Sequence, residues 1–277
     1  MPESNVVLIE AGQAEKKYWR DIWRYRELLY FLAWRDVLVR YKQTVIGIAW
    51  VVIRPLLIML IFTFAFGKIA KLPTEGNVPY PLLVLSGLLP WQFFSTALSE
   101  ASTSLISNAN LITKVYFPRI IVPASTVITS VVDFAVTLVL LAGLMAWYGV
   151  SPTWRVLFIP LLVLLMMLAA MGTGLWLAAL NVKYRDFRYV VPFIVQFGLY
   201  ISPVGFSSRL VPDSLGWLFA LNPMVGVING FRWALFSHST ERLDLLPLIA
   251  SGVVSTLILA AGLSYFRRTE RLFADVI

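Results

Sequence analysis

The sequence predicts an all-α protein that crosses a membrane several times, and three observations support this. Apolar residues make up 59% of the 277 residues and charged residues only 14%. The apolar residues gather in runs of the length that a helix needs to cross a bilayer, about 20 residues. Basic residues gather in alternate loops, as they do on the cytoplasmic side of membrane proteins. The net charge of +8 therefore indicates loop asymmetry rather than nucleic-acid binding.

Residues 1–43 predict a cytoplasmic N-terminus that contains an amphipathic interface helix at about 18–41. Its longest uncharged run, residues 28–34, is too short to span a bilayer. Trp and Tyr favour the headgroup layer and Arg and Lys favour anionic lipid, so this helix is expected to lie along the membrane face, with its polar side free to meet a partner. Its aromatic and basic side chains alternate: Trp19, Trp23, Tyr25, Tyr30, Phe31, Trp34 and Tyr41 among Arg20, Arg24, Arg26, Arg35, Arg40 and Lys42.

Residues 44–277 predict a domain of six membrane spans, at about 46–66, 81–100, 120–148, 156–180, 189–206 and 245–266. Loops placed inside hold sixteen basic residues: Lys16, Lys17, Arg20, Arg24, Arg26, Arg35, Arg40, Lys42, Lys114, Arg119, Lys183, Arg185, Arg188, Arg267, Arg268 and Arg271. The opposite side holds six: Lys68, Lys71, Arg155, Arg209, Arg232 and Arg242. This asymmetry predicts that both termini are cytoplasmic.

The first, second and fifth spans carry polar residues that the other spans lack. These are Arg54 and Pro55; Pro90, Trp91, Gln92, Ser95, Thr96 and Glu100; and Pro192, Gln196, Tyr200, Ser202 and Pro203. Polar groups in hydrocarbon are costly unless they face protein or a wet cavity, so these spans are expected to form the interior surface. The alternative is that the polar groups only hold helices together.

Two other spans have features that indicate packing. In the fourth, Ala170, Gly174 and Ala178 follow the small-xxx-small spacing that lets helix backbones approach closely. In the third, Asp133 is a deep carboxylate without a second acid or a histidine beside it in the sequence. An ion or proton relay and structural pairing are both open to it, and we favour structural pairing.

The stretch NANLITKVYFPR, residues 108–119, is a short polar loop between two long apolar runs. Asn110 is expected to cap a helix of about two turns that Pro118 ends. Such a helix would show Leu111, Ile112, Val115 and Phe117 on one side. An exposed apolar patch of this kind marks a protein interface, so we interpret the loop as the place where another protein pushes on this one.

Residues 207–238 form a long external segment that is too apolar for a simple loop. Asn222 followed by Pro223 is a helix-start signal, with a cap before a proline at the first helical position. We expect two short helices that dip into the outer leaflet and return.

The sequence also lacks the residues of several kinds of chemistry. It contains no G-x-x-x-x-G-K-[ST] motif, no cysteine and a single histidine, His238. We therefore expect no catalytic site, bound cofactor or metal in this chain, and any energy for transport must enter through a partner.

Several segments together resemble the membrane (permease) subunit of bacterial ABC type 2 exporters of polysaccharide, of the O-antigen and teichoic-acid kind. These are WRDVLVRYKQTVIGIAWVVIRPLL, FTFAFGKIA, SGLLPWQFF, NLITKVYFPR, NVKYRDFRYVVP, YISPVGF and NPMVGVINGFRWALF. They occur in order along essentially the whole chain.

The resemblance implies a homodimer in the bacterial inner membrane, joined to two copies of a cytoplasmic ATPase that binds ATP and Mg²⁺. Residues 108–119 would be the coupling helix, with Asn110, Leu111, Ile112, Lys114, Val115, Tyr116, Phe117 and Arg119 contacting the ATPase. Residues 207–238 would be periplasmic gate helices. A lipid-linked polysaccharide would pass through a channel whose expected lining residues are Trp91, Gln92, Phe94, Gln196 and Tyr200, because aromatic rings stack on sugar faces.

Three other interpretations remain open from the sequence. An exporter of a drug or small lipid would need a narrower pore without aromatic residues along it. A membrane enzyme that modifies glycans would need a His or acid constellation that this sequence lacks. A structural scaffold would not explain polar spans or the apolar external segment.

Overall fold

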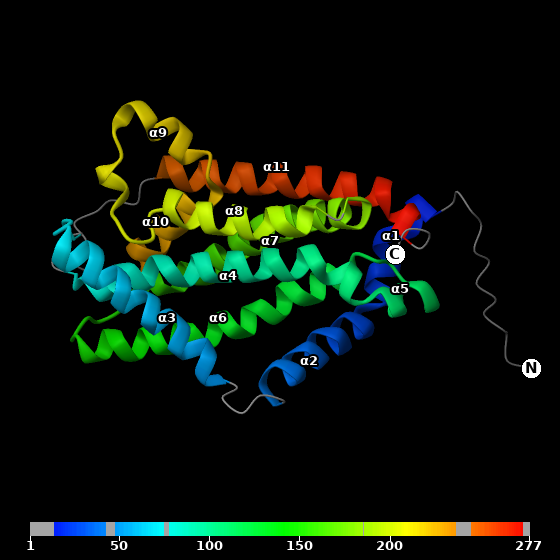
Figure 1. The fold of residues 1–277 in the computed structure, drawn as a ribbon, viewed down its shortest axis with the longest axis horizontal. Coiled ribbons are helices and arrows are strands. Elements are labelled where there is room, and N and C mark those ends of the chain that lie inside the picture. Colours follow the sequence, from blue (N-terminus) through cyan, green and yellow to red (C-terminus); the bar gives the residue numbers. More distant parts are fainter. Residues whose placement is uncertain (1–13, 43–47, 75–77, 185, 237–244, 274–277) are drawn as a thin grey trace, which may run out of the picture.

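The computed structural model describes residues 14–42, 48–74, 78–184, 186–236 and 245–273, and in these ranges every regular element is helical. The long helices lie side by side along one axis (Figure 1). This confirms the all-α prediction. His238 and the last residues of the predicted gate helices lie outside the described ranges.

The N-terminal amphipathic region forms two helices rather than one, α1 (Ala14–Arg24) and α2 (Arg26–Lys42), with a turn at Tyr25. α2 packs across α6 and buries Leu32 and Ala33. Leu28 and Leu29 are half-buried, whereas Phe31 and Trp34 are exposed. One face of α2 thus packs on the protein and another is exposed, as an interfacial helix requires.

Five helical segments in the described ranges are long and apolar enough to cross a membrane. They are α3 (Ile48–Phe62) continued by the π-helix η1 (Thr63–Ile69); α4 (Tyr80–Ser107); α6 (Ile121–Trp147); η2 (Trp154–Phe158) continued by α7 (Ile159–Lys183); and α11 (Leu245–Thr269), which leads into η4 (Glu270–Leu272). The count rises to six if the bent pair α9–α10 is taken as one span.

The predicted fifth span is shorter than expected. It forms α8 (Phe187–Ile201), which has 15 residues and packs on α4 and α7. At a rise of 1.5 Å per residue such a helix is about 22 Å long, less than the hydrocarbon thickness. The helix ends where Ser202 adopts an extended conformation, because the residue before a proline, here Pro203, is disfavoured in the helical region.

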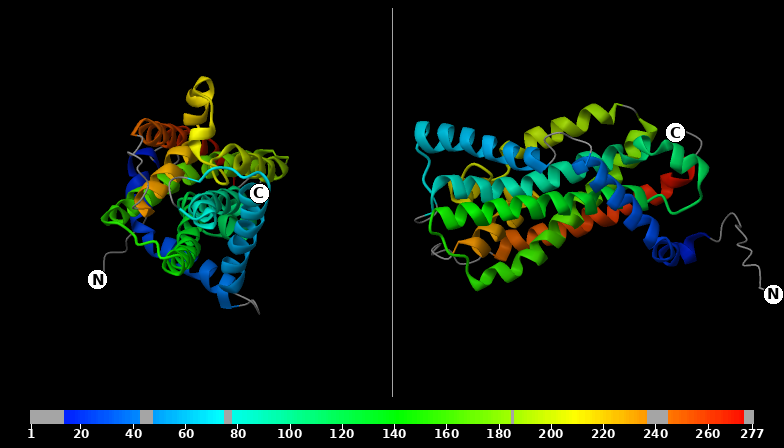
Figure 2. Two further views of the ribbon diagram at one scale, coloured as in Figure 1. Left: turned by 90° about the vertical axis from the view of Figure 1, so that its left-hand side faces the viewer. Right: turned by 90° about the horizontal axis from the view of Figure 1, so that it is seen from below.

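Helix α4 lies near the centre of the bundle (Figure 2). It packs against α6, α7, α10, α3 and α8, and most of its residues are buried. The small residues of α7 permit one of these contacts: Ala170 and Ala178 are fully buried, and a Cβ at Gly174 would lie 2.7 Å from the Cβ of Ala101 in α4. The close-packing prediction for the fourth span is confirmed.

The external segment contains the 3-10 turn η3 (Ser208–Leu210) and two short helices, α9 (Asp213–Ala220) and α10 (Pro223–Leu235), bent by 93°. The predicted start of the second helix is confirmed, because the Asn222 side chain accepts a hydrogen bond from the Met224 N–H at 3.0 Å. α9 projects from the bundle (Figure 1), whereas α10 is buried between α4, α7 and α11. Protein rather than lipid therefore surrounds the inner helix of the pair.

Arg232 of α10 does not lie in an exposed loop, although the charge count placed it there. It is buried, and its guanidinium donates to the carbonyl oxygens of Phe206 (3.0 Å), Val204 (3.2 Å) and Leu83 (3.3 Å). These bonds tie α10 to α4 and to the chain that follows α8.

Candidate functional site

The loop between α4 and α6 contains one short helix, α5 (Ala109–Lys114). The residue before it is Asn108, so the prediction that Asn110 caps the helix is wrong; Asn110 is an exposed residue within it. The Asn108 side chain is held elsewhere: its Oδ1 accepts from Arg35 of α2 at 3.1 Å, and its Nδ2 donates to the Ser104 carbonyl at 2.9 Å. The loop is therefore fixed at its first residue to both α2 and α4.

The prediction that this loop exposes an apolar face is wrong for Ile112 and Phe117. Ile112 and Phe117 are each only 4% exposed, inside a cluster that includes Leu105, Leu175, Phe266 and Phe273, and Leu111 packs against that cluster. The prediction assumed that helical spacing continues through Phe117. The helix instead ends at Lys114 and Val115 is extended, so the chain turns back toward α6 and takes Phe117 inside.

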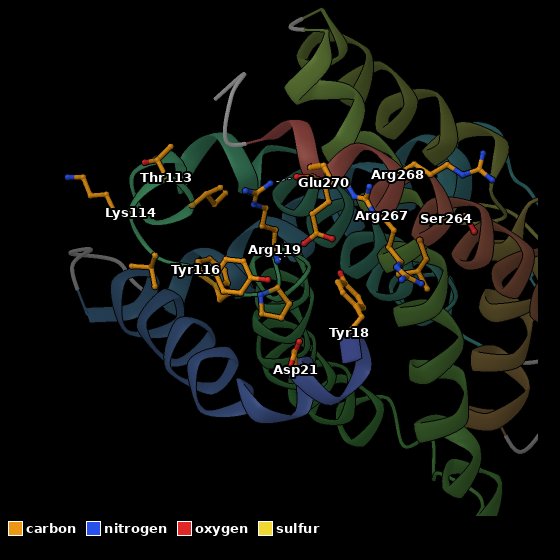
Figure 3. A pocket seen from close by; sticks show the side chains of 16 residues that line it. Tyr18, Asp21, Thr113, Lys114, Tyr116, Arg119, Ser264, Arg267, Arg268 and Glu270 are labelled. Atoms are coloured by element: carbon orange, nitrogen blue, oxygen red, sulfur yellow. Dashed lines mark hydrogen bonds between the residues drawn. The ribbon is translucent and has the colours of Figure 1, made fainter. Parts of the chain in front are cut away.

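The loop exposes four consecutive residues, 113–116, which we call the crest. Val115 is 49% exposed and Tyr116 is 64% exposed, and Thr113 and Lys114 are exposed beside them. The crest projects from the bundle between α1 and the end of α11 (Figure 3). Four of the predicted contact residues are thus exposed: Lys114, Val115 and Tyr116 on the crest, and Asn110 on α5.

Behind the crest, the loop is tied to the C-terminal end of α11. The Arg119 backbone N–H donates to Glu270 Oε1 at 2.9 Å, and the Arg119 guanidinium donates to the Glu270 carbonyl oxygen. Tyr18 of α1 lies beside Glu270, and the Arg267 guanidinium lies 4.8 Å from the Tyr18 ring centroid (Figure 3). Movement of the loop would therefore act on α1 and α11 as well as on α4 and α6.

Burial raises the pKa of Glu270, and the Arg119 backbone N–H partly opposes this. Burial, followed by the Glu270 charge, raises the pKa of the Tyr18 hydroxyl. Tyr18 and Glu270 were not among the site residues predicted from the sequence. Glu270 is 151 residues from Arg119, and no local pattern joins them.

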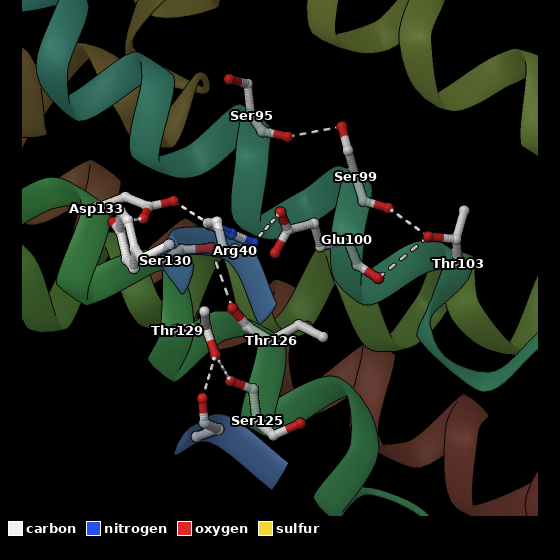
Figure 4. Close-up of polar contacts among 12 residues, drawn as sticks. Arg40, Ser95, Ser99, Glu100, Thr103, Ser125, Thr126, Thr129, Ser130 and Asp133 are labelled. Atoms are coloured by element: carbon white, nitrogen blue, oxygen red, sulfur yellow. Dashed lines mark hydrogen bonds and ion pairs between the residues drawn. The ribbon is translucent and has the colours of Figure 1, made fainter. Parts of the chain in front are cut away.

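A second polar group lies where α2 meets α4 and α6 (Figure 4). Asp133 accepts hydrogen bonds from the Arg40 guanidinium and the Tyr41 hydroxyl, and Arg40 also forms an ion pair with Glu100. The prediction that Asp133 is structurally paired is confirmed. The cation, Arg40, comes from α2 of the interface region, whose polar side was expected to face a partner protein.

Trp91 and Phe94 are buried in the core of the subunit, where they are 5% and 7% exposed and their ring centroids lie 5.6 Å apart. The Trp91 ring packs on α8, since a Cβ at Gly198 would lie 2.3 Å from its Cη2. The single chain thus uses these two rings for packing. Gln92 borders a cavity of about 190 Å³ that Arg54 and Asp133 also line.

A row of exposed aromatic residues lies on α8 instead. Tyr189, Phe193, Phe197 and Tyr200 are 73%, 59%, 53% and 63% exposed, and the centroids of Phe193 and Phe197 are 4.2 Å apart. Spacings of three and four residues place them on one side of the helix, with Gln196 exposed among them. Only Gln196 and Tyr200 of this face were predicted from the sequence, although the helical spacing of the other rings also indicates a shared face.

Within the described ranges, no three His, Asp or Glu side chains lie close enough together to hold a metal ion. The features that the structure brings together are an apolar helix bundle, a protruding loop tied to two terminal helices, and an exposed aromatic helix face. They define a multi-pass membrane protein with an exposed loop at one end of its helix bundle.

The ABC-2 type transporter family matches residues 27–236, and the chain belongs to this family. An O-antigen export system permease protein of Myxococcus xanthus is 31% identical over 93% of this chain and 98% of that protein. A protein of the same description from Klebsiella pneumoniae is 29% identical over 91% of this chain and 95% of its own length. A polysialic acid transport protein of Escherichia coli is 23% identical over 85% and 91% of the two chains.

Proposed function

We propose that this chain is the permease subunit of an ATP-driven exporter of a lipid-linked polysaccharide in a bacterial inner membrane. The observation that carries the proposal is the exposed aromatic face of α8. Rings spaced along one helix offer a sugar polymer many equivalent stacking positions, so the polymer is held weakly and can slide. The relatives, described as O-antigen export and polysialic acid transport proteins, support the same substrate class.

In this proposal the chain works as a homodimer. Arg54 on α3 and Gln196 on α8 are exposed in membrane helices, where facing lipid would be costly. Both helices pack on α4. A second copy related by a two-fold axis would enclose these surfaces in a hydrated channel.

The energy comes from two copies of a separate ATPase that bind ATP and Mg²⁺. The crest is their contact, and it lies at the same end of the bundle as α1 and η4 (Figure 1). That end is cytoplasmic in this proposal, with both termini inside, because the basic loops gather there.

The test replaces Phe193, Phe197 and Tyr200 together by Ala. Export should fall by about tenfold or more, since each lost ring removes a stacking contact of roughly 0.5–1.5 kcal/mol. The matched control replaces Trp147 and Tyr148 by Ala. These residues are 82% and 44% exposed at the C-terminal end of α6, and this variant should export normally. Normal export by the triple variant, assembled as well as the wild type, would contradict the role given to α8.

A further inference from the structure

A cavity of about 900 Å³ lies between α1, residues 112–119 and the end of α11 (Figure 3). It is separate from the aromatic face of α8. Five basic residues line it, against two acidic ones: Lys114, Arg119, Arg267, Arg268 and Arg271, against Asp21 and Glu270.

The basic residues of this cavity are of two kinds. Arg119 and Arg267 are engaged with Glu270 and with the Tyr18 ring. Lys114, Arg268 and Arg271 are exposed, and no acidic side chain in the described ranges forms an ion pair with them. The cavity therefore has a surplus of positive charge that an anion would neutralise.

The cavity lies where α11 leaves the membrane. Leu257, two turns before the cavity residues Leu263 and Ser264, is 63% exposed on the apolar outer side of the helix. On the other flank, Trp19 and Trp23 of α1 are 60% and 70% exposed, as rings in the headgroup layer are. A bilayer centred on the apolar span of α11 would bring the cavity level with lipid phosphates.

We propose that the cavity binds the headgroup of an anionic phospholipid from the leaflet that it faces. Arg268 and Arg271 would hold the phosphate oxygens through charge-assisted hydrogen bonds. Lys114, on the opposite side of the site (Figure 3), would add positive charge at longer range. Basic pockets between helices on the cytoplasmic side of membrane proteins bind headgroups in this way. The volume is within the range of small-molecule sites and has room for a phosphate with its glycerol.

A lipid in this position touches three elements at once: α1, the crest and the end of α11. It lies beside the contact between Arg119 and Glu270, which holds the same elements together. The bound lipid would therefore fix the loop on which the ATPase is proposed to push. Only the assignment to the cytoplasmic leaflet rests on the proposed function.

The test compares lipid retention by the purified full-length chain in mild detergent. The chain is delipidated, then offered cardiolipin, phosphatidylglycerol or phosphatidylethanolamine, and bound lipid is counted by native mass spectrometry. The pocket variant is Arg268→Gln with Arg271→Gln. The control is Lys68→Gln with Lys71→Gln, which removes the same charge from exposed positions near the end of η1, outside the cavity.

The wild type and the control should retain the two anionic lipids in preference to phosphatidylethanolamine. The pocket variant should retain less anionic lipid by a factor of about ten or more, because each basic side chain beside anionic lipid changes the affinity roughly fivefold. The charge-keeping variant Arg268→Lys with Arg271→Lys should recover most of the binding. Equal retention by the pocket variant and the control would overturn the proposal.

A second measurement separates lipid from protein as the occupant. If an acidic segment of the ATPase fills the cavity, the pocket variant loses the ATPase while its lipid retention is unchanged, and the proposal fails. Lipid retention is measured on the chain alone, so a failure of the export proposal would leave it unaffected.

Discussion

Two substitutions in the loop between α4 and α6 should have opposite effects, although only one residue separates them. Phe117 is 4% exposed in the cluster that joins the loop to α7 and α11, whereas Val115 is 49% exposed on the crest. Phe117→Asp should therefore damage the fold. Val115→Asp should damage only the contact with the ATPase.

The magnitudes follow from burial. Emptying a Phe site in a core costs about 3–5 kcal/mol, and an unpaired buried charge adds to it. The total for Phe117→Asp is comparable with the roughly 5–15 kcal/mol that holds a typical domain together. A change at a half-exposed position such as Val115 costs about 0.5 kcal/mol within the chain. In an interface, the lost apolar contact and the added charge should weaken ATPase binding by about tenfold or more.

The assay measures thermal unfolding of each variant in detergent and its binding to the purified ATPase. Val115→Asp and Tyr116→Ala should unfold like the wild type and bind poorly, whereas Phe117→Asp should unfold at a much lower temperature or fail to accumulate. Normal ATPase binding by both crest variants would refute the crest as the contact. Wild-type unfolding of Phe117→Asp would refute its place in the core.

Two further predictions concern the polar groups. Arg40→Met removes the cation that pairs with both Asp133 and Glu100, although Asp133 keeps its hydrogen bond from Tyr41. It should lower the free energy of unfolding by about 2–4 kcal/mol. This is below the full cost of breaking a buried pair, because 19–33% of each of the three paired side chains is exposed. Adding Asp133→Leu should recover part of the loss in the same unfolding assay. Burial raises the pKa of Glu270, so the folded protein favours the protonated carboxyl group. The contribution of this group to stability therefore falls as the pH rises from the ordinary carboxyl pKa through the raised pKa. Glu270→Gln should remove this pH dependence and leave the unfolding temperature at pH 7 unchanged or higher. Glu270→Ala instead leaves the Arg119 backbone N–H without its acceptor and should lower the free energy of unfolding by about 1–3 kcal/mol.

The sequence predicted those features that depend on neighbouring residues. The length and apolarity of the runs predicted the long helices, and Asn222 before Pro223 predicted the start of α10. The four-residue spacing of Ala170, Gly174 and Ala178 predicted a close helix contact. Each of these signals lies within one element.

The features that the sequence did not predict depend on where distant elements meet. The helical spacing of residues 111–117 indicated an exposed face, but the helix stops at Lys114 and the core takes Ile112 and Phe117. Trp91 was expected to line the channel because aromatic rings stack on sugars, yet α8 covers its ring at Gly198. The partners of Asp133 and Arg119 are 93 and 151 residues away, and nothing local reveals them.

The most direct test of the account is transport by purified components in closed vesicles. The chain is reconstituted with and without the ATPase, and a lipid-linked polysaccharide is placed on the crest side of the membrane. We expect the polymer to reach the opposite side only with both proteins and ATP, and the chain alone to hydrolyse no ATP. Polymer transfer without the ATPase, ATP turnover by the isolated chain, or transfer of a small lipid but not of the polysaccharide would contradict the account.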